Sequence, residues 1–315
     1  MTAAPAIEAL GLAKRFGRTT ALEDLSLTVA RGEAFGFLGP NGAGKTTAVK
    51  LLLGLCRPTS GAAEILGAPI GDRETRRSVG YLPELFRYQD WLTAREVLSF
   101  HARLIGVPRS KRAANIGETL ELVGLVTRAD DRVGKFSKGM QQRLGLGVAL
   151  LGAPALVFLD EPTSALDPAG RRDVRAIVEQ LCARGTTVFL NSHLLTEVER
   201  VCDRVAFVDC GRVVASGTIA EILGAARSLR LRLESVDEKA RAILTRYGTG
   251  LDAEPPWFTL RGVAESDVPR LVSELAAAGA AIHTVEPART TLEDRFLQLL
   301  SHDDSDADDR RTDVS

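Results

Sequence analysis

The segment GPNGAGKT, Gly39 to Thr46, constrains the fold of this chain more than any other stretch. It follows the short apolar run AFGFL, which predicts a buried strand. It precedes TAVKLLLGLCRP, which predicts a helix that is stopped by Pro58. Glycine backbones can adopt conformations barred to other residues, so the N–H groups of this loop can turn inward. The order of strand, glycine-rich loop and helix predicts a phosphate site at the start of the helix.

Two side chains of the loop have expected roles of their own. We expect Lys45 to reach the β- and γ-phosphates of a nucleotide and Thr46 to offer its hydroxyl to Mg²⁺. A glycine-rich turn that matches by chance is the alternative, and the flanking strand and helix argue against it. The loop residues expected to contact the nucleotide are Gly39, Pro40, Asn41, Gly42, Ala43, Gly44, Lys45, Thr46 and Thr47.

A run without charge, LGLGVALLGAPALVFL at residues 144–159, is the one candidate for a membrane span. A span needs roughly 20 apolar residues, and this run is shorter and interrupted by glycines and Pro154. We therefore predict a buried helix, a Gly-Ala-Pro turn and a buried parallel strand. If this protein works at a membrane, another chain must span it.

Two adjacent acids, Asp160 and Glu161, end that strand. Ligands of α/β sheets bind at the carboxyl ends of the strands, so Asp160 is placed to hold Mg²⁺ directly or through water. Side chains alternate along a strand, so we expect Glu161 on the opposite face, where it can orient or deprotonate an attacking water. The alternative is a charged strand end at a turn with no functional role. The upstream phosphate loop favours the functional interpretation of the two acids.

The chain divides into regions of different texture. Short strands at 7–38 are followed by a polar helical stretch from about 86, and strands then alternate with helices, which predicts a parallel sheet with helical layers. From about residue 229 a new pattern begins, with LRLRLE as a half-buried strand. We predict a large domain at 1–228 with a helical subdomain at about 86–150, a small α+β domain at 229–300, and an acidic disordered tail at 301–315.

Composition excludes several classes of function. The formal net charge is −1, so bulk electrostatics points neither to nucleic acid nor to an anionic membrane. The N-terminus has no basic segment followed by a long apolar stretch, so we expect no secretion signal. The four cysteines form no CxxC pair and have no histidine at metal-ligand spacing, which favours small buried side chains in a reducing compartment.

With these motifs in order, residues 1 to about 225 resemble the ATP-binding subunit of ABC transporters. The stretch KFSKGMQQR is similar to the signature motif of that family, with Ser137 and Gly139 at its serine and second glycine. The resemblance implies a P-loop NTPase of the α/β class with an N-terminal antiparallel β subdomain, a helical subdomain and, in this chain, a small C-terminal α+β domain. It also implies ATP and Mg²⁺ as cofactors and ATP hydrolysis as the activity.

The resemblance implies roles for further residues. Phe16 matches the aromatic residue that stacks on adenine, and His193 matches the switch histidine that contacts the γ-phosphate. The segment SALD, Ser164 to Asp167, matches the loop through which two subunits touch. Ser137 and Gly139 would dock on the γ-phosphate held by a second copy of the chain, so that ATP lies between two copies. The expected catalytic residues are therefore Glu161 and His193.

Three positions depart from the family pattern. Lys138 stands where glycine is usual and Met140 where glutamine is usual. Glu84 stands where a glutamine normally senses Mg²⁺ and the attacking water; an ionised glutamate is acceptor-only but can still ligate Mg²⁺. Together with the appended C-terminal domain, these features resemble a branch of exporters for drugs, antibiotics, lipids or polysaccharides. In that branch the permease is a separate chain, which implies a peripheral place on the cytoplasmic face of the membrane.

Two alternatives stay open. One is a non-transport ATPase of the same type, acting on ribosomes or DNA; the single phosphate loop, the lack of a long heptad array and the near-neutral charge argue against it. The other is a nucleotide-sensing regulatory module that hydrolyses little ATP. The aromatic residues Phe86, Tyr88 and Trp91 can form a socket for the permease or can simply pack within the helical subdomain.

Overall fold

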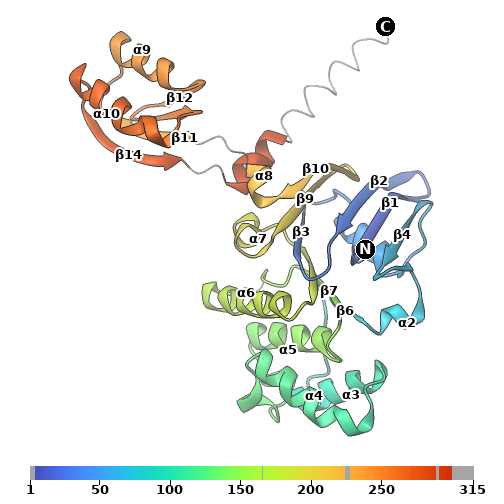
Figure 1. Cartoon of the computed structure of the whole chain (residues 1–315). Coiled ribbons are helices and arrows are strands. Elements are labelled where there is room, and N and C mark those ends of the chain that lie inside the picture. The colour runs from blue at the N-terminus through green and yellow to red at the C-terminus, as the bar shows by residue number, and fades with distance from the viewer. Residues whose placement is uncertain (1–3, 165, 224–227, 289–290, 300–315) are drawn as a thin grey trace. The chain divides into compact units, whose positions relative to one another are not determined.

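A computed structural model describes residues 4–164, 166–223, 228–288 and 291–299 (Figure 1). The tail expected at 301–315, and Ala165 within the segment Ser164 to Asp167, lie outside the described residues. The chain forms two compact units, Met1–Ile219 and Ala220–Ser315, and each is described by itself. The domain limits drawn from the sequence at 228, 229 and 300 stay predictions.

The first unit is built on one mixed sheet with the strand order β5-β4-β1-β2-β10-β9-β3-β8-β7-β6. Its N-terminal part is antiparallel, and its five central and far strands β9, β3, β8, β7 and β6 are parallel. The strands are β1 (Ile7–Phe16), β2 (Thr19–Val29), β3 (Ala34–Leu38), β4 (Ser60–Ile65), β5 (Ala68–Pro69), β6 (Val79–Leu82), β7 (Leu156–Asp160), β8 (Thr187–Asn191), β9 (Arg204–Asp209) and β10 (Arg212–Thr218).

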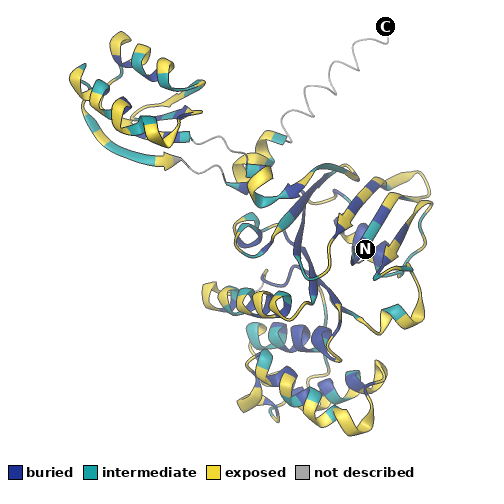
Figure 2. Ribbon diagram, in the orientation of Figure 1, coloured by how far each residue is buried: buried dark blue, intermediate teal, exposed yellow. Residues whose placement is uncertain are grey.

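The centre of this sheet is the core of the unit. Strands β3, β7 and β8 are buried along their whole length, as Figure 2 shows, because helices cover both faces of the parallel part. Phe189 of β8 packs against Phe158 and Phe37 of the neighbouring strands, with ring centroids 5.1 and 5.2 Å apart. This apolar centre holds the carboxyl ends of the three strands in fixed register.

Helices surround the sheet, and three of them lie within the interval 86–150. Helix α3 begins with a capping box of Thr93 and Glu96, in which both reciprocal side-chain-to-backbone hydrogen bonds are formed. The helices of the unit are α1 (Lys45–Leu52), α2 (Arg73–Arg76), α3 (Ala94–Leu104), α4 (Arg109–Leu122), α5 (Lys138–Leu150), α6 (Pro168–Ala183) and α7 (Leu195–Val201), with α8 (Ile219–Leu223) at the junction of the two units.

One helix boundary differs from the prediction. Helix α1 ends at Leu52 rather than before Pro58, because Gly54 has a left-handed backbone with φ of 64°. The N–H of Leu55 then bonds to the carbonyl of Lys50 at 2.8 Å, which closes the last turn. The glycine, and not the proline, stops the helix.

The uncharged run at 144–159 divides as predicted into a helix and a strand. Helix α5 ends at Leu150 and β7 begins at Leu156. Gly152 and Ala153 between them have φ of 78° and 52°, which turns the chain sharply. Among the described residues, no helix is both long and apolar enough to cross a membrane.

The second unit contains a four-stranded antiparallel sheet with the order β12-β13-β11-β14. The chain runs β-α-β-β-α-β, the split βαβ arrangement. Its elements are β11 (Ser228–Leu233), α9 (Glu238–Tyr247), β12 (Gly250–Glu254), β13 (Trp257–Arg261), α10 (Val268–Ala277) and β14 (Ile282–Ala288), followed by a helical stretch at 292–299. The alternation in β11 is as predicted: Leu229, Leu231 and Leu233 are buried in the core with α9 and α10.

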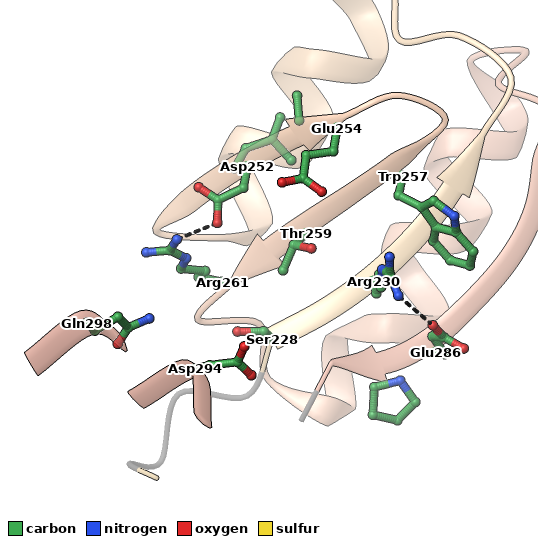
Figure 3. A pocket seen from close by; sticks show the side chains of 13 residues that line it. Ser228, Arg230, Asp252, Glu254, Trp257, Thr259, Arg261, Glu286, Asp294 and Gln298 are labelled. Atoms are coloured by element: carbon green, nitrogen blue, oxygen red, sulfur yellow. Dashed lines mark hydrogen bonds and ion pairs between the residues drawn. The ribbon is translucent and has the colours of Figure 1, made fainter. Parts of the chain in front are cut away.

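The opposite face of this small sheet carries charged side chains (Figure 3). The guanidinium of Arg230 lies 4.2 Å from the ring centroid of Trp257 and 3.8 Å from the carboxylate of Glu286. Arg261 pairs with Asp252 on the neighbouring strand. We call these side chains, with the indole of Trp257, the open face of the C-terminal sheet.

Candidate nucleotide site

The phosphate loop joins β3 to α1 and fits tightly against its surroundings. A Cβ atom at Gly39 would lie 2.1 Å from the carbonyl oxygen of Val208, and one at Gly44 would lie 2.4 Å from that of Ala21. Gly44 also has a left-handed backbone with φ of 96°. Both positions therefore require glycine, Gly39 for space and Gly44 for space and conformation.

A turn outside the loop braces it. The N–H of Gly211, between β9 and β10, donates to the carbonyl of Ala43 at 3.0 Å. The carbonyl of Gly211 in turn accepts from the N–H of Glu23 in β2 at 2.9 Å. The hairpin of β9 and β10 thus ties the loop to the antiparallel strands, a contact that the sequence did not indicate.

Lys45 is buried beneath the loop, and its ammonium spans it. Its Nζ donates to the carbonyl oxygens of Gly39 at 2.7 Å and Pro40 at 3.0 Å. Burial lowers the pKa of Lys45, and the nearby charges of Glu161, Asp160 and Glu84 act in the opposite direction. A buried cation among carboxylates at the start of a helix is well placed for phosphate oxygens.

Asp160 ends β7, and Asn191, its partner in register on β8, holds it. The Nδ2 of Asn191 donates to Oδ1 of Asp160 at 2.5 Å, while the second oxygen of Asp160 is free of that bond. Only 2% of Asp160 is exposed. Burial raises the pKa of this carboxyl. The hydrogen bond from Asn191 lowers that pKa, and the negative charges of Glu84 and Glu161 raise it further. Sequence reasoning missed Asn191, because only the pairing of two distant strands brings it to Asp160.

Glu161 lies just beyond the end of β7, so strand alternation, the reason given for its expected direction, does not apply to it. Its backbone has φ of 51°, which bends the chain directly after Asp160. Its N–H donates to the carbonyl of Asn191 at 2.9 Å, and this bond across to β8 holds the bend. With this bend, the Glu161 carboxylate lies beside the segment that follows β8.

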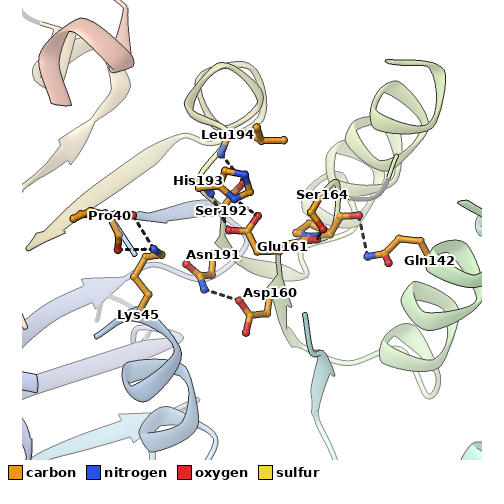
Figure 4. A network of polar contacts seen from close by, with 12 residues as sticks. Pro40, Lys45, Gln142, Asp160, Glu161, Ser164, Asn191, Ser192, His193 and Leu194 are labelled. Atoms are coloured by element: carbon orange, nitrogen blue, oxygen red, sulfur yellow. Dashed lines mark hydrogen bonds and ion pairs between the residues drawn. The ribbon is translucent and has the colours of Figure 1, made fainter. Parts of the chain in front are cut away.

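The carboxylate of Glu161 meets His193 just after β8 (Figure 4). Oε1 accepts from the backbone N–H of His193 at 3.0 Å, and Oε2 lies 2.8 Å from its Nδ1. The contact to Nδ1 is a hydrogen bond only when that nitrogen carries the proton, and Oε2 is buried with no other partner among the described residues. Glu161 and His193 therefore form a pair with a proton-dependent contact.

The oxygen ligands at this edge fit Mg²⁺. Thr46 is exposed in the first turn of α1, and the charge of Glu84, after β6, acts on both Asp160 and Lys45. Among the described residues, no three His, Cys, Asp or Glu side chains are grouped so as to hold a metal by themselves. Mg²⁺ is usually held by one or two carboxylates together with phosphates and waters, so a hydroxyl and two carboxylates suit it.

The remaining predicted residues lie apart from this cluster. Ser137 is the exposed N-cap of α5, and its hydroxyl accepts from the N–H of Met140 at 3.3 Å. Gln142 of the same helix, which the sequence analysis did not single out, donates to the carbonyl of Pro162 at 3.0 Å. Phe16 is 54% exposed at the end of β1, with the ammonium of Lys14 4.9 Å from its ring centroid.

A glycine loop between strand β3 and helix α1, with an acid pair at the carboxyl end of β7 two strands away in the same sheet, defines an ATPase of the phosphate-loop class. The model of the family "ABC transporter" matches residues 22–164. An uncharacterised ABC transporter ATP-binding protein of Synechocystis sp. is 42% identical over 90% of this chain and 79% of its own length. The chain belongs to the ATP-binding subunits of ABC transporters.

Further similarities support the same assignment. The daunorubicin/doxorubicin resistance ATP-binding protein of Streptomyces peucetius is 34% identical over 98% of this chain and 95% of its own length. A solved ATP-binding subunit of an ABC transporter is 32% identical, with a TM-score of 0.63 over 69% of this chain and 91% of that one. A dimeric ATP-binding cassette in a post-hydrolysis state with ADP and Pi has a TM-score of 0.62 at 23% identity over 68% of this chain and 99% of that one.

Proposed function

We propose that the chain hydrolyses Mg²⁺-ATP between two copies of itself and thereby drives export through a separate permease. The observation that carries the proposal is the meeting of Lys45, Asp160, Glu161 and His193 at one edge of the sheet, from three adjacent strands. This edge is where parallel α/β sheets bind their ligands.

In this proposal the loop from Gly39 to Thr47 wraps the phosphates, and Lys45 leaves the carbonyls of Gly39 and Pro40 for the β- and γ-phosphate oxygens. Phe16 stacks on the adenine. Thr46, Asp160 and Glu84 would hold Mg²⁺, and the ion would supply positive charge to neutralise the phosphates. Asn191 donates to one oxygen of Asp160, so the other oxygen would be available to the metal.

Glu161 then takes the proton of the attacking water. Its carboxylate is fixed by the backbone N–H of His193, so it is held in place for a water between it and the γ-phosphate. The imidazole of His193, 55% exposed, can turn from Glu161 to the γ-phosphate oxygens. Bound phosphate would compete for this imidazole and free Oε2 to accept the water proton.

A second copy completes each site. Ser137 caps α5 at an exposed end, and the first N–H groups of a helix favour anions. We infer that this end, with Gly139, meets the γ-phosphate held by the loop of the other copy. The dimeric state of the similar cassette with ADP and Pi supports this arrangement.

Mixing two inactive variants tests the shared site. A chain with Lys45→Ala has a defective phosphate loop but an intact N-terminus of α5. A chain with Ser137→Ala and Gly139→Asp has an intact phosphate loop but a defective N-terminus of α5. A mixed dimer has one site made only of intact parts, so we expect ATP turnover to return on mixing. Turnover that stays at the level of the separate variants would contradict the shared site.

The permease is expected to dock on the helical part of the first unit. Phe86 and Tyr88 pack inward, since a Cβ at Gly145 would lie 2.5 Å from the Phe86 ring and burial raises the pKa of the Tyr88 hydroxyl. Trp91, however, is 70% exposed and Leu85 is 87% exposed. The aromatic residues therefore divide between packing and a surface open to a partner.

An exporter further requires the chain to lie on the cytoplasmic face of the membrane, attached through that permease. The named resistance relative supports the exporter branch. Co-purification of the full-length chain with a separate membrane permease from the cells that produce it tests the assignment. We expect Trp91→Ser together with Leu85→Ser to abolish co-purification and to leave basal ATP hydrolysis unchanged. Loss of basal hydrolysis in that variant would instead assign the two residues to internal packing.

A further inference from the structure

Helix α7 follows the switch histidine closely in the chain and buries few of its own residues. His193 stands two residues before its first turn, and the N-cap, Leu194, makes no side-chain capping bond. Of the seven residues of the helix, only Glu197 and Val198 are buried. Short helices depend on tertiary contacts, so these two buried residues help to hold α7 in place.

The two anchors contact different elements. The side chain of Val198 packs at Gly36 of β3, where a Cβ would lie 2.6 Å from its Cγ1. The carboxylate of Glu197 lies 3.4 Å from Nε of Arg175 on α6. Adjacent helical residues point about 100° apart, so two such anchors fix the rotation of the helix as well as its position.

Burying this ion pair costs free energy, because both charged groups lose contact with water. Only 21% of the Arg175 side chain and 12% of the Glu197 side chain are exposed. Nε of Arg175 and Oε2 of Glu197 are buried and make no hydrogen bond with any described residue. A buried pair without such bonds contributes little to stability compared with apolar side chains of the same size. Apolar side chains at these two places would stabilise the fold as well, so the presence of an ion pair indicates that it serves to position α7.

Helix α6 is a firm base for that anchor and lies between α5 and α7 (Figure 1). Its N-cap, Asp167, accepts from the N–H of Gly170 at 2.8 Å. Asp173 of α6 pairs with Arg143 of α5 at 2.5 Å. Two residues further on, Arg175 faces α7, so α6 joins the signature helix to the helix of the switch histidine through an ion pair on each side.

We propose that Arg175 and Glu197 are positioning residues for ATP hydrolysis, which fix the rotation of α7 and so keep His193 beside Glu161. The proposal rests on the role of His193 given under the proposed function. Neither residue touches the nucleotide; both act through His193.

The test is a set of variants of the full-length chain, measured for kcat and for the KM of ATP. We expect Glu197→Gln to lower kcat about 10- to 100-fold, since small misplacements cost that much, with the KM of ATP unchanged. The pair of changes Arg175→Met and Glu197→Leu replaces both charges by apolar side chains, which keeps the helix packed. We expect it to fold with an undiminished melting temperature and to lose kcat equally.

His193→Ala separates position from general stability. In that background we expect Glu197→Gln to cause no further loss of kcat, because the two changes act at one step. A loss that multiplies the first, or full kcat in the apolar double variant, would overturn the proposal. If His193→Ala alone leaves kcat unchanged, the role of His193 in the proposed function fails instead. Glu74→Gln, which breaks an exposed pair with Arg77, is the matched control and should change nothing.

Discussion

The edge of the large sheet and the open face of the C-terminal sheet use the same kinds of side chains in opposite ways. At the edge, Asp160 and Glu161 are 2% and 7% exposed, and within the described part of the chain Oε2 of Glu161 contacts only Nδ1 of His193. On the open face, Arg261 and Asp252 are paired and each about half exposed. Burying an incompletely paired charge is costly, whereas an exposed ion pair costs and contributes little. Desolvation of the charged side chains, and not their number, therefore distinguishes the nucleotide site from the open face.

The largest effect that tests this contrast is the loss of Glu161. Glu161→Gln keeps the shape and removes the base, so we expect turnover to fall about 10²- to 10⁴-fold with ATP binding retained. Steady-state ATP hydrolysis and nucleotide binding measure the two quantities. The matched control is Glu254→Gln in the C-terminal unit, on an exposed strand, which should leave turnover unchanged. Rapid hydrolysis by Glu161→Gln would remove this residue from the role of base.

Lys45 is expected to give the next largest effect. Lys45→Met removes the buried cation, so transition-state stabilisation should fall about 10²- to 10³-fold, measured as kcat/KM for ATP. Arg261→Met, the control, removes an exposed cation and should leave kcat/KM at the wild-type value. Equal losses in the two variants would break the distinction between the two regions.

A smaller effect concerns the acid side of the pH profile. Burial raises the pKa of Asp160, and the charge of Glu84 adds to this rise. Glu84→Gln removes that charge, so the pKa of Asp160 should decrease and the carboxylate should stay ionised to lower pH. We therefore expect the acid limb of kcat/KM for Mg²⁺-ATP to move to lower pH. An acid limb that stays in place or moves upward would contradict the coupling of Glu84 to Asp160.

The smallest effect is expected on the open face. Asp252→Asn breaks the pair with Arg261, and exposed pairs contribute less than about 1 kcal/mol to the free energy of unfolding. Thermal unfolding in low and high salt measures this, and neither ATP binding nor turnover should change. A loss of several kcal/mol, or a change in turnover, would show that the face is more than a solvated surface.

The phosphate loop, the acid pair and the division of the uncharged run could be predicted from the amino-acid sequence, because each is a local pattern of strand, turn and helix. Lys45 lies at the start of α1 and Asp160 at the carboxyl end of β7, where the patterns predict them. Local patterns fix which residues sit at strand ends because backbone hydrogen bonding and burial act over a few residues.

How those residues come together depends on contacts between segments that are distant in the chain. The register of β7 and β8 brings Asn191 to Asp160, and the bond from the N–H of Glu161 to Asn191 bends the chain away from the expected strand geometry. Likewise, Arg175 reaches Glu197 through the packing of α6 on α7. These partners are separated by 20 or more residues, and no local pattern encodes which distant strand or helix will lie alongside. Local sequence patterns therefore specify which chemical groups the site contains, and long-range packing specifies how these groups are arranged.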